Sequence, residues 1–134
     1  MIPRLLLDTH ILIRWFSDPK KLSRNQSRVL EQAVKRSEPI AISDVTLLEM
    51  AVLLSEGSHR INSSIDDLFA DLQDHPLFRI LPVTYEIAAE VASMGPSLRD
   101  PADRAIVATA RMHRLVLVTS DQRIIESKLV TTVE

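Results

Sequence analysis

The chain has 134 residues, of which 46% are hydrophobic and 4% are aromatic, so aliphatic side chains must form the core of a single domain at residues 1–134. It contains no cysteine, which excludes disulfide frameworks, thiolate metal sites and cysteine nucleophiles. The net charge of −2 is unevenly distributed, because residues 1–37 carry eight Lys or Arg against three acids, whereas residues 38–90 carry ten acids against two Arg. The basic segment could meet phosphate, although a solvated helix face is the simpler explanation.

Apolar runs and polar caps divide the chain into alternating strands and helices. In chain order we expect a strand at 4–7, helices at 11–16 and 25–36, a strand at 39–42, helices at 45–55 and 65–73, a strand at 78–83, helices at 85–94 and 101–113, a strand at 115–118 and an edge strand at 130–133. Expected helix caps are Ser23, Ser43, Ser63 with Ser64, Thr84 and Asp100. This alternation predicts an α/β fold with a parallel sheet covered by helices on both faces.

No internal repeat, low-complexity tract or linker divides the chain. No segment has the roughly 18 apolar residues of a membrane span, and the apolar stretch before Asp8 is too short for a secretory signal. We therefore expect a soluble, cytoplasmic protein with no membrane partner.

Two acids end the two strongest strands. Asp8 follows the leucines of the first, and Asp121 follows the strand at 115–118 after Thr119 and Ser120. Ligands bind at the carboxyl ends of strands in open α/β sheets, although either acid alone could equally be a helix cap or a turn residue. The hydroxyls of Thr119 and Ser120 could orient a carboxylate or a bound water.

Glu49 stands in the helical sequence VTLLEMAVLL, which is otherwise apolar except for Thr46. A helix that is apolar nearly all round is buried, so Glu49 should be partly desolvated. A buried carboxylate must be neutralised, paired or bound to a metal, and a structural partner such as an Arg is the alternative to a functional role.

Asp100 and Asp103 share one face of a helix. Asp100 precedes Pro101 and is expected to be the N-cap, whereas Asp103 is either a metal ligand or a charge that suits the helix dipole. The small apolar residues that follow allow this helix to pack closely on the sheet, near the strand ends. We expect Asp103 to be the ligand and Asp100 to be the cap or a supporting residue.

Asp8, Glu49, Asp103 and Asp121 all fall at strand ends or in the N-terminal halves of helices, which lie on one side of such a sheet. Clustered carboxylates repel one another, and Mg²⁺ or Mn²⁺, which prefer oxygen ligands, would relieve that repulsion. The four histidines lack ligand spacing, so zinc is not expected. Carboxylate-held cations suit hydrolysis of phosphodiester bonds by an activated water.

The segments LLLDTHILIRWF, ISDVTLLEMAVL, RDPADRAIVATA and LVTSDQRI cover nearly the whole chain, and together they resemble the PIN-domain ribonucleases, most of all the VapC-type toxins of bacterial toxin–antitoxin pairs. The resemblance implies the strand order 3-2-1-4-5, a Mg²⁺- or Mn²⁺-dependent endoribonuclease, a homodimer and a cognate antitoxin that blocks the site. It places the family's acidic residues on Asp8, Glu49, Asp103 and Asp121. It also places an assisting hydroxyl on Thr9 and on Thr119 or Ser120.

Basic residues near the first helices could contact RNA phosphates, which dominate RNA affinity. These are Arg14, Lys20, Lys21, Arg24 and Arg28. Arg104 could do the same or could pair with a neighbouring acid. Trp15 and Phe16 are expected in the core or at a dimer interface, and the apolar helices at 11–16 and 45–54 could supply the dimer surface.

Two alternatives belong to other functional classes. One is a PIN-like RNA- or protein-binding module without catalysis, against which the four intact acids argue. The other is a response-regulator-like receiver, which needs an acceptor Asp after its third strand and a late catalytic Lys. Here the strand at 78–83 is followed by Thr84 and Tyr85, and the only late lysine is Lys128.

Overall fold

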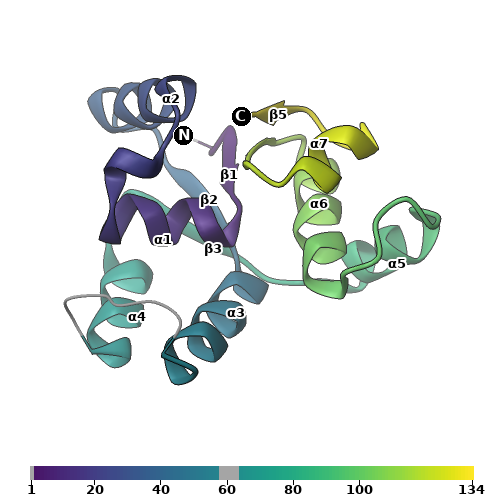
Figure 1. Ribbon diagram of the computed structural model, residues 1–134, viewed down its shortest axis with the longest axis horizontal. Helices are drawn as coiled ribbons and strands as arrows, with labels where there is room; N and C mark the ends of the chain where they lie inside the picture. The colour runs from purple at the N-terminus through teal and green to yellow at the C-terminus, as the bar shows by residue number, and fades with distance from the viewer. Residues whose placement is uncertain (1, 58–63) are drawn as a thin grey trace.

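The computed structural model describes residues 2–57 and 64–134 (Figure 1). Its strands are β1 (Leu5–Leu7), β2 (Ile40–Ser43), β3 (Phe78–Leu81), β4 (Val116–Val118) and β5 (Thr132–Val133). All pair in parallel, in the order β3-β2-β1-β4-β5, which confirms the expected α/β fold and strand order. A receiver-type sheet has the order 2-1-3-4-5, so that alternative is excluded.

The strands are connected by helices, as the alternating pattern predicts. The helices in the described part of the chain are α1 (Thr9–Ser17), the short 3₁₀ turn η1 (Pro19–Lys21), α2 (Arg24–Lys35), α3 (Asp44–Ser55), α4 (Ile65–Asp74), α5 (Tyr85–Ser93), α6 (Pro101–His113) and α7 (Gln122–Ser127). The expected caps Ser23, Ser43, Ser64, Thr84 and Asp100 each accept a backbone N–H at a helix start, whereas Ser63 lies outside the described residues.

Several boundaries differ from the expected ones. The first helix starts at Thr9 rather than Ile11, because Asp8 is its cap as well as the end of β1. Helix α7 was not expected, and it is only six residues long. The edge strand is limited to Thr132–Val133, and β3 ends at Leu81, because Pro82 offers no N–H to continue a ladder.

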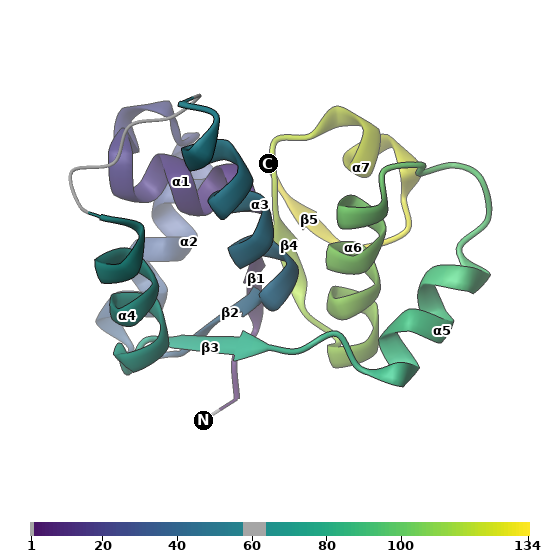
Figure 2. The same cartoon turned by 90° about the horizontal axis from the view of Figure 1, so that it is seen from below.

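Alternate residues of β1 serve two cores, one on each face of the sheet. Leu5 and Leu7 join the core formed with α1, α2, α3 and α4, whereas Leu6 joins the core formed with α5, α6 and α7. Figures 1 and 2 show these two groups of helices on opposite sides of the strands. The sheet is therefore covered on both faces, and its carboxyl edge is left for a site.

Helix α3 is less buried than its apolar sequence indicates. Its core-facing side includes Met50, which has no exposed surface, but Leu48 is 67% and Val52 is 46% exposed. The expectation that this helix is buried all round was therefore wrong, because its length is covered by neighbours on one side only. None of the helices in the described residues has the length and apolarity that crossing a bilayer requires.

Candidate functional site

Asp8 lies at the carboxyl end of the central strand β1 and is 3% exposed. Its Oδ1 accepts a hydrogen bond from the backbone N–H of Thr9 at 2.9 Å, which caps α1. Its Oδ2 accepts one from the hydroxyl of Thr119 at 2.7 Å. Donors at both oxygens offset the cost of burying this carboxylate and fix its direction.

Glu49 is half-buried on α3, where it faces the first residue of α1. The hydroxyl of Thr9 donates to Glu49 Oε1 at 2.5 Å. Since that hydroxyl has one proton, it accepts at its second contact, from the hydroxyl of buried Thr46 at 3.0 Å. Burial raises the pKa of Glu49, the Thr9 hydrogen bond opposes this, and the charge of Asp8 adds to the rise.

Asp103 lies in the first turn of α6 and is 9% exposed. Burial raises its pKa from an ordinary value of 3.8 to about 7, and repulsion from nearby carboxylates acts in the same direction. Those carboxylates are, in decreasing order of effect, Asp100, Asp8, Asp121 and Glu49. These charges act on Asp103, as expected if the predicted acids share one edge of the sheet.

Asp100 has the capping role expected for it. Its Oδ1 accepts from the backbone N–H of Asp103 at 3.0 Å, so that oxygen is committed to the helix start. Asp100 itself is exposed, whereas Asp103 is buried among the other acids. This difference favours Asp103 over Asp100 as a direct ligand.

Asp121 comes three residues after β4 and caps α7 through the backbone N–H of Arg123 at 2.9 Å. The Arg123 guanidinium also pairs with it, with Nη2 at 3.3 Å from Asp121 Oδ2. Hydrogen bonding and attraction by Asp121 raise the pKa of Arg123, which keeps its charge. The carboxylate of Asp121, which was predicted to bind a metal, is thus paired with the positively charged Arg123.

The structure adds His10 and Gln26 to this edge, neither of which was expected there. His10 Nδ1 is 3.5 Å from Asp8 Oδ2, and its Nε2 accepts from the N–H of Ser120 at 2.9 Å. The amide nitrogen of fully buried Gln26 donates to the Ser120 hydroxyl at 2.8 Å. For His10 the available signal was its position two residues after Asp8. For Gln26 it was the capping-box spacing from Ser23.

His10 is neutral in this arrangement. Its Nε2 accepts a hydrogen bond, so the ring proton is assigned to Nδ1, on the side of Asp8. Burial lowers the pKa of His10, against the attraction of Asp8. Nε2 is therefore bound to the Ser120 N–H, and Nδ1 faces Asp8 Oδ2 at 3.5 Å.

The acids are near neighbours, but Asp8, Glu49 and Asp121 are each held by a partner of their own. In residues 2–57 and 64–134, no three His, Asp or Glu side chains are grouped closely enough to hold one metal ion. Asp8 is turned to Thr119, Glu49 to Thr9 and Asp121 to Arg123. By donor type the set fits a hard cation, because carboxylates and hydroxyls supply only oxygen.

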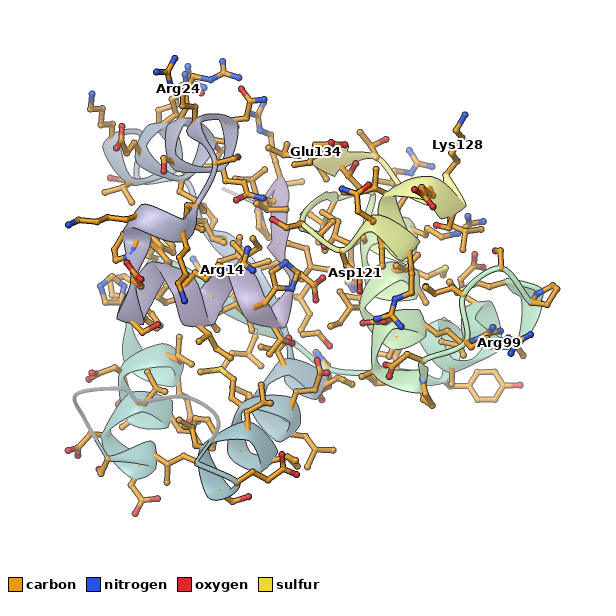
Figure 3. All side chains as sticks on the ribbon, viewed as in Figure 1. Arg14, Arg24, Arg99, Asp121, Lys128 and Glu134 are labelled. Carbon is orange, nitrogen blue, oxygen red and sulfur yellow. The ribbon has the colours of Figure 1, made fainter. Side chains whose placement is uncertain are left out.

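The residues predicted to contact RNA fall into two groups. One is on η1 and the start of α2, and the other is Arg14 on α1. Lys20, Lys21 and Arg24 are exposed on η1 and at the start of α2. Figure 3 shows Arg14 on α1 facing the region of Asp121, whereas Arg24 lies at the outer end of α2.

Arg104 belongs with neither group. Its guanidinium donates to the carbonyls of Val91, Gly95 and Leu98 at 2.6–2.7 Å, which fastens the end of α5 and the following loop to α6. This geometry indicates a structural role rather than contact with RNA or an ion pair.

Comparison with known proteins agrees with this fold. The chain is 31% identical over 121 residues to Ribonuclease VapC22 of Mycobacterium tuberculosis, an alignment that covers 90% of this chain and 88% of that protein. Its structure is similar to a chain of the toxin–antitoxin complex from Klebsiella pneumoniae, with a TM-score of 0.65, 26% identity and 96% of both chains covered. FitAcB from Neisseria gonorrhoeae has the same fold, with a TM-score of 0.70, 23% identity and coverage of 97% of this chain and 96% of that one.

The PIN domain family matches residues 5–128, from β1 to the end of α7. That span contains Asp8, Glu49, Asp103 and Asp121. The chain belongs to the PIN domain family.

Proposed function

We propose that this protein is a divalent-cation-dependent endoribonuclease whose site is the sheet edge carrying Asp8, Glu49, Asp103 and Asp121. The observation that carries the proposal is the pKa of Asp103, which burial and four neighbouring carboxylates raise to about 7. Such repulsion is costly in a folded protein unless positive charge is supplied at the site. A catalytic cation site accounts for keeping these acids together.

Mg²⁺ or Mn²⁺ is the cation that this donor set fits best, because both prefer carboxylate oxygens and water. The four acids would hold it, with Asp100 at the rim. Bound there, the cation supplies a water of lowered pKa and stabilises charge on the leaving oxygen. The chain's own contribution is to hold Asp8 in place through Thr119 and Glu49 through Thr9.

RNA is the proposed substrate, supported by the 31% identity to a protein named a ribonuclease and by the charge distribution. Arg14, Lys20, Lys21 and Arg24 form a basic surface on α1, η1 and the start of α2, the elements that directly follow Asp8 in the chain. Backbone phosphates are bound by such residues, with strong dependence on salt. Helix α4 has Asp66 and Asp67 in its first turn, which would repel the same backbone.

We also propose that the protein is the toxin of a toxin–antitoxin pair and forms a homodimer. The similarity to a chain of the Klebsiella pneumoniae complex, at 26% identity, supports an antitoxin partner. The exposed face of α3, with Leu48 and Val52, supports a contact between copies, because solvent-facing apolar residues on one helix face mark interaction surfaces.

The test is cleavage of RNA by the purified protein with Mg²⁺ or Mn²⁺. Asp103→Asn removes one charge from a side chain that makes no hydrogen bond through its carboxylate in the described structure, so the fold should persist. Asp8→Asn removes an acceptor at the centre of the site. We expect either change to lower the cleavage rate by about 10²-fold or more.

Unchanged cleavage in both variants would contradict the proposed chemistry. The alternative is a PIN-domain module that binds RNA or protein without catalysis. That function would be indicated by RNA binding that persists while calorimetry detects no Mn²⁺ binding.

A further inference from the structure

The loop between β4 and α7 carries Asp121 and is held at several atoms by α1 and α2. It consists of Thr119, Ser120 and Asp121, of which Thr119 has no exposed surface. The loop has no strand partner for its own N–H groups beyond Thr119, whose N–H donates to Val133. Its position is therefore set by side chains from elsewhere in the chain.

His10 supplies one of these contacts. The Ser120 N–H donates to His10 Nε2 at 2.9 Å, over a sequence separation of 110 residues. The other ring nitrogen is 3.5 Å from Asp8 Oδ2. One imidazole therefore spans the distance between the central acid and the loop that carries Asp121.

Gln26 supplies the second contact, from α2. Its amide nitrogen donates to the Ser120 hydroxyl at 2.8 Å and approaches the Thr119 carbonyl at 3.4 Å. Its amide oxygen accepts from the Ser23 N–H at 2.9 Å, in the capping box of α2. The box uses only the oxygen, so the nitrogen is left for the loop, and the two ends fix the direction of the amide.

We propose that His10 and Gln26 are positioning residues that clamp the Thr119–Asp121 loop, so that Asp121 is presented to the cation site beside Asp8. The cation site in this proposal rests on the proposed function. The contacts that form the clamp do not depend on it. Neither residue contacts the reacting atoms. Each acts through the backbone or hydroxyl of Ser120, and groups that orient metal ligands in this way affect metal affinity by about 10- to 100-fold.

The experiment compares His10→Leu and Gln26→Met with matched controls. His10→Gln retains an acceptor near the position of Nε2 and should restore the contact with the Ser120 N–H. Ser23→Ala removes the hydroxyl that accepts from the Gln26 N–H, and so weakens the capping box while leaving the Gln26 amide on the loop. It controls for loss of stability at the same helix start.

Two readouts are independent of RNA cleavage: hydrogen exchange at the Ser120 amide, and Mn²⁺ affinity by calorimetry. We expect His10→Leu and Gln26→Met to speed Ser120 exchange by about tenfold or more and to weaken Mn²⁺ binding by about 10- to 100-fold. His10→Gln should behave like the wild type in both measurements. Ser23→Ala should lower the melting temperature but leave both Ser120 exchange and Mn²⁺ affinity unchanged.

The clamp would be overturned if His10→Leu and Gln26→Met, once folded, match Ser23→Ala in Ser120 exchange and Mn²⁺ affinity. If only one of the two variants folds, that variant decides the result against the same control. A wild-type protein that binds no Mn²⁺ would contradict the proposed function instead, and Ser120 exchange would still decide whether the clamp exists.

Discussion

The hydroxyl of Thr119 connects two acids that are far apart in the sequence. It donates to Asp8 Oδ2 at 2.7 Å and accepts from the backbone N–H of Asp121 at 3.0 Å. The two contacts use the proton and a lone pair of the same oxygen. Thr119 thereby sets where the end of β4 lies relative to the end of β1.

Replacing Thr119 with Val should remove both contacts at nearly unchanged volume. Asp8 would lose a buried donor, which costs about 1–3 kcal/mol of the free energy of unfolding. We expect a loss of stability in urea unfolding and a fall in RNA cleavage of about tenfold or more. Thr119→Ser keeps the hydroxyl and should retain most of the activity. Equal activity in the Val and Ser variants would show that this hydroxyl does not orient Asp8.

The raised pKa of Asp103 predicts that the stability of the metal-free protein falls as the pH rises. Its pKa is about 7 in the folded chain and 3.8 ordinarily, so between these values the folded state binds more protons than the unfolded state. The free energy of unfolding therefore falls as pH rises through this window. Burial lowers the pKa of His10, which has the opposite effect, so the measurement must isolate Asp103.

The measurement is the melting temperature of the wild type and of Asp103→Asn in chelator, from about pH 5 to about pH 8. We expect the wild type to lose stability relative to the variant as pH rises. Added Mg²⁺ should reduce this loss, because it neutralises the deprotonated site. Parallel profiles for the two proteins would contradict the raised pKa.

Arg123 should compete with a cation for Asp121. The Arg123 side chain is 76% exposed, so its ion pair with Asp121 is weak and easily displaced. We expect Arg123→Gln to tighten Mn²⁺ binding by about two- to fivefold, measured by calorimetry. Arg99→Gln, which removes another exposed positive charge next to Asp100, is the matched control and should have a smaller effect. Weaker Mn²⁺ binding in Arg123→Gln would show that the arginine supports the site.

We expect Arg104 to stabilise the fold rather than to contact RNA. Arg104→Ala removes the guanidinium that donates to the carbonyls of Val91, Gly95 and Leu98, at a cost of about 1–3 kcal/mol in the free energy of unfolding. At a temperature where the variant remains folded, its RNA affinity should equal that of the wild type. A selective loss of RNA affinity without loss of stability would instead restore the prediction that it contacts phosphate.

The basic surface should determine how RNA binding depends on salt. Replacing Lys20 and Lys21 with Ala should weaken binding and reduce the slope of log affinity against log salt by about 1.4, two phosphate contacts at about 0.7 each on a single strand. Lys128→Ala removes a charge at the far end of α7 and serves as the control (Figure 3). An unchanged slope in the double variant would place the RNA elsewhere.

The layout of the fold was predictable from local signals, with errors where those signals are short. Apolar runs and caps identified each strand and most helices, since both depend on neighbouring residues. Helix α7 was missed because six residues carry too little periodicity to be recognised. The apolar sequence of α3 predicted burial on all sides, yet Leu48 is 67% exposed, because which side of a helix is covered depends on its neighbours in space.

The sequence by itself determined the parallel α/β fold and the placement of Asp8, Glu49, Asp103 and Asp121 at strand ends and helix starts, because chain order fixes which edge of a parallel sheet those positions reach. Only the tertiary structure decided which partners hold three of these carboxylates. Thr119 holds Asp8, Thr9 holds Glu49, and Arg123 neutralises Asp121. It also brought His10 and Gln26 to Ser120. Contacts of this kind join residues that are distant in sequence, and no local pattern encodes a distance between them.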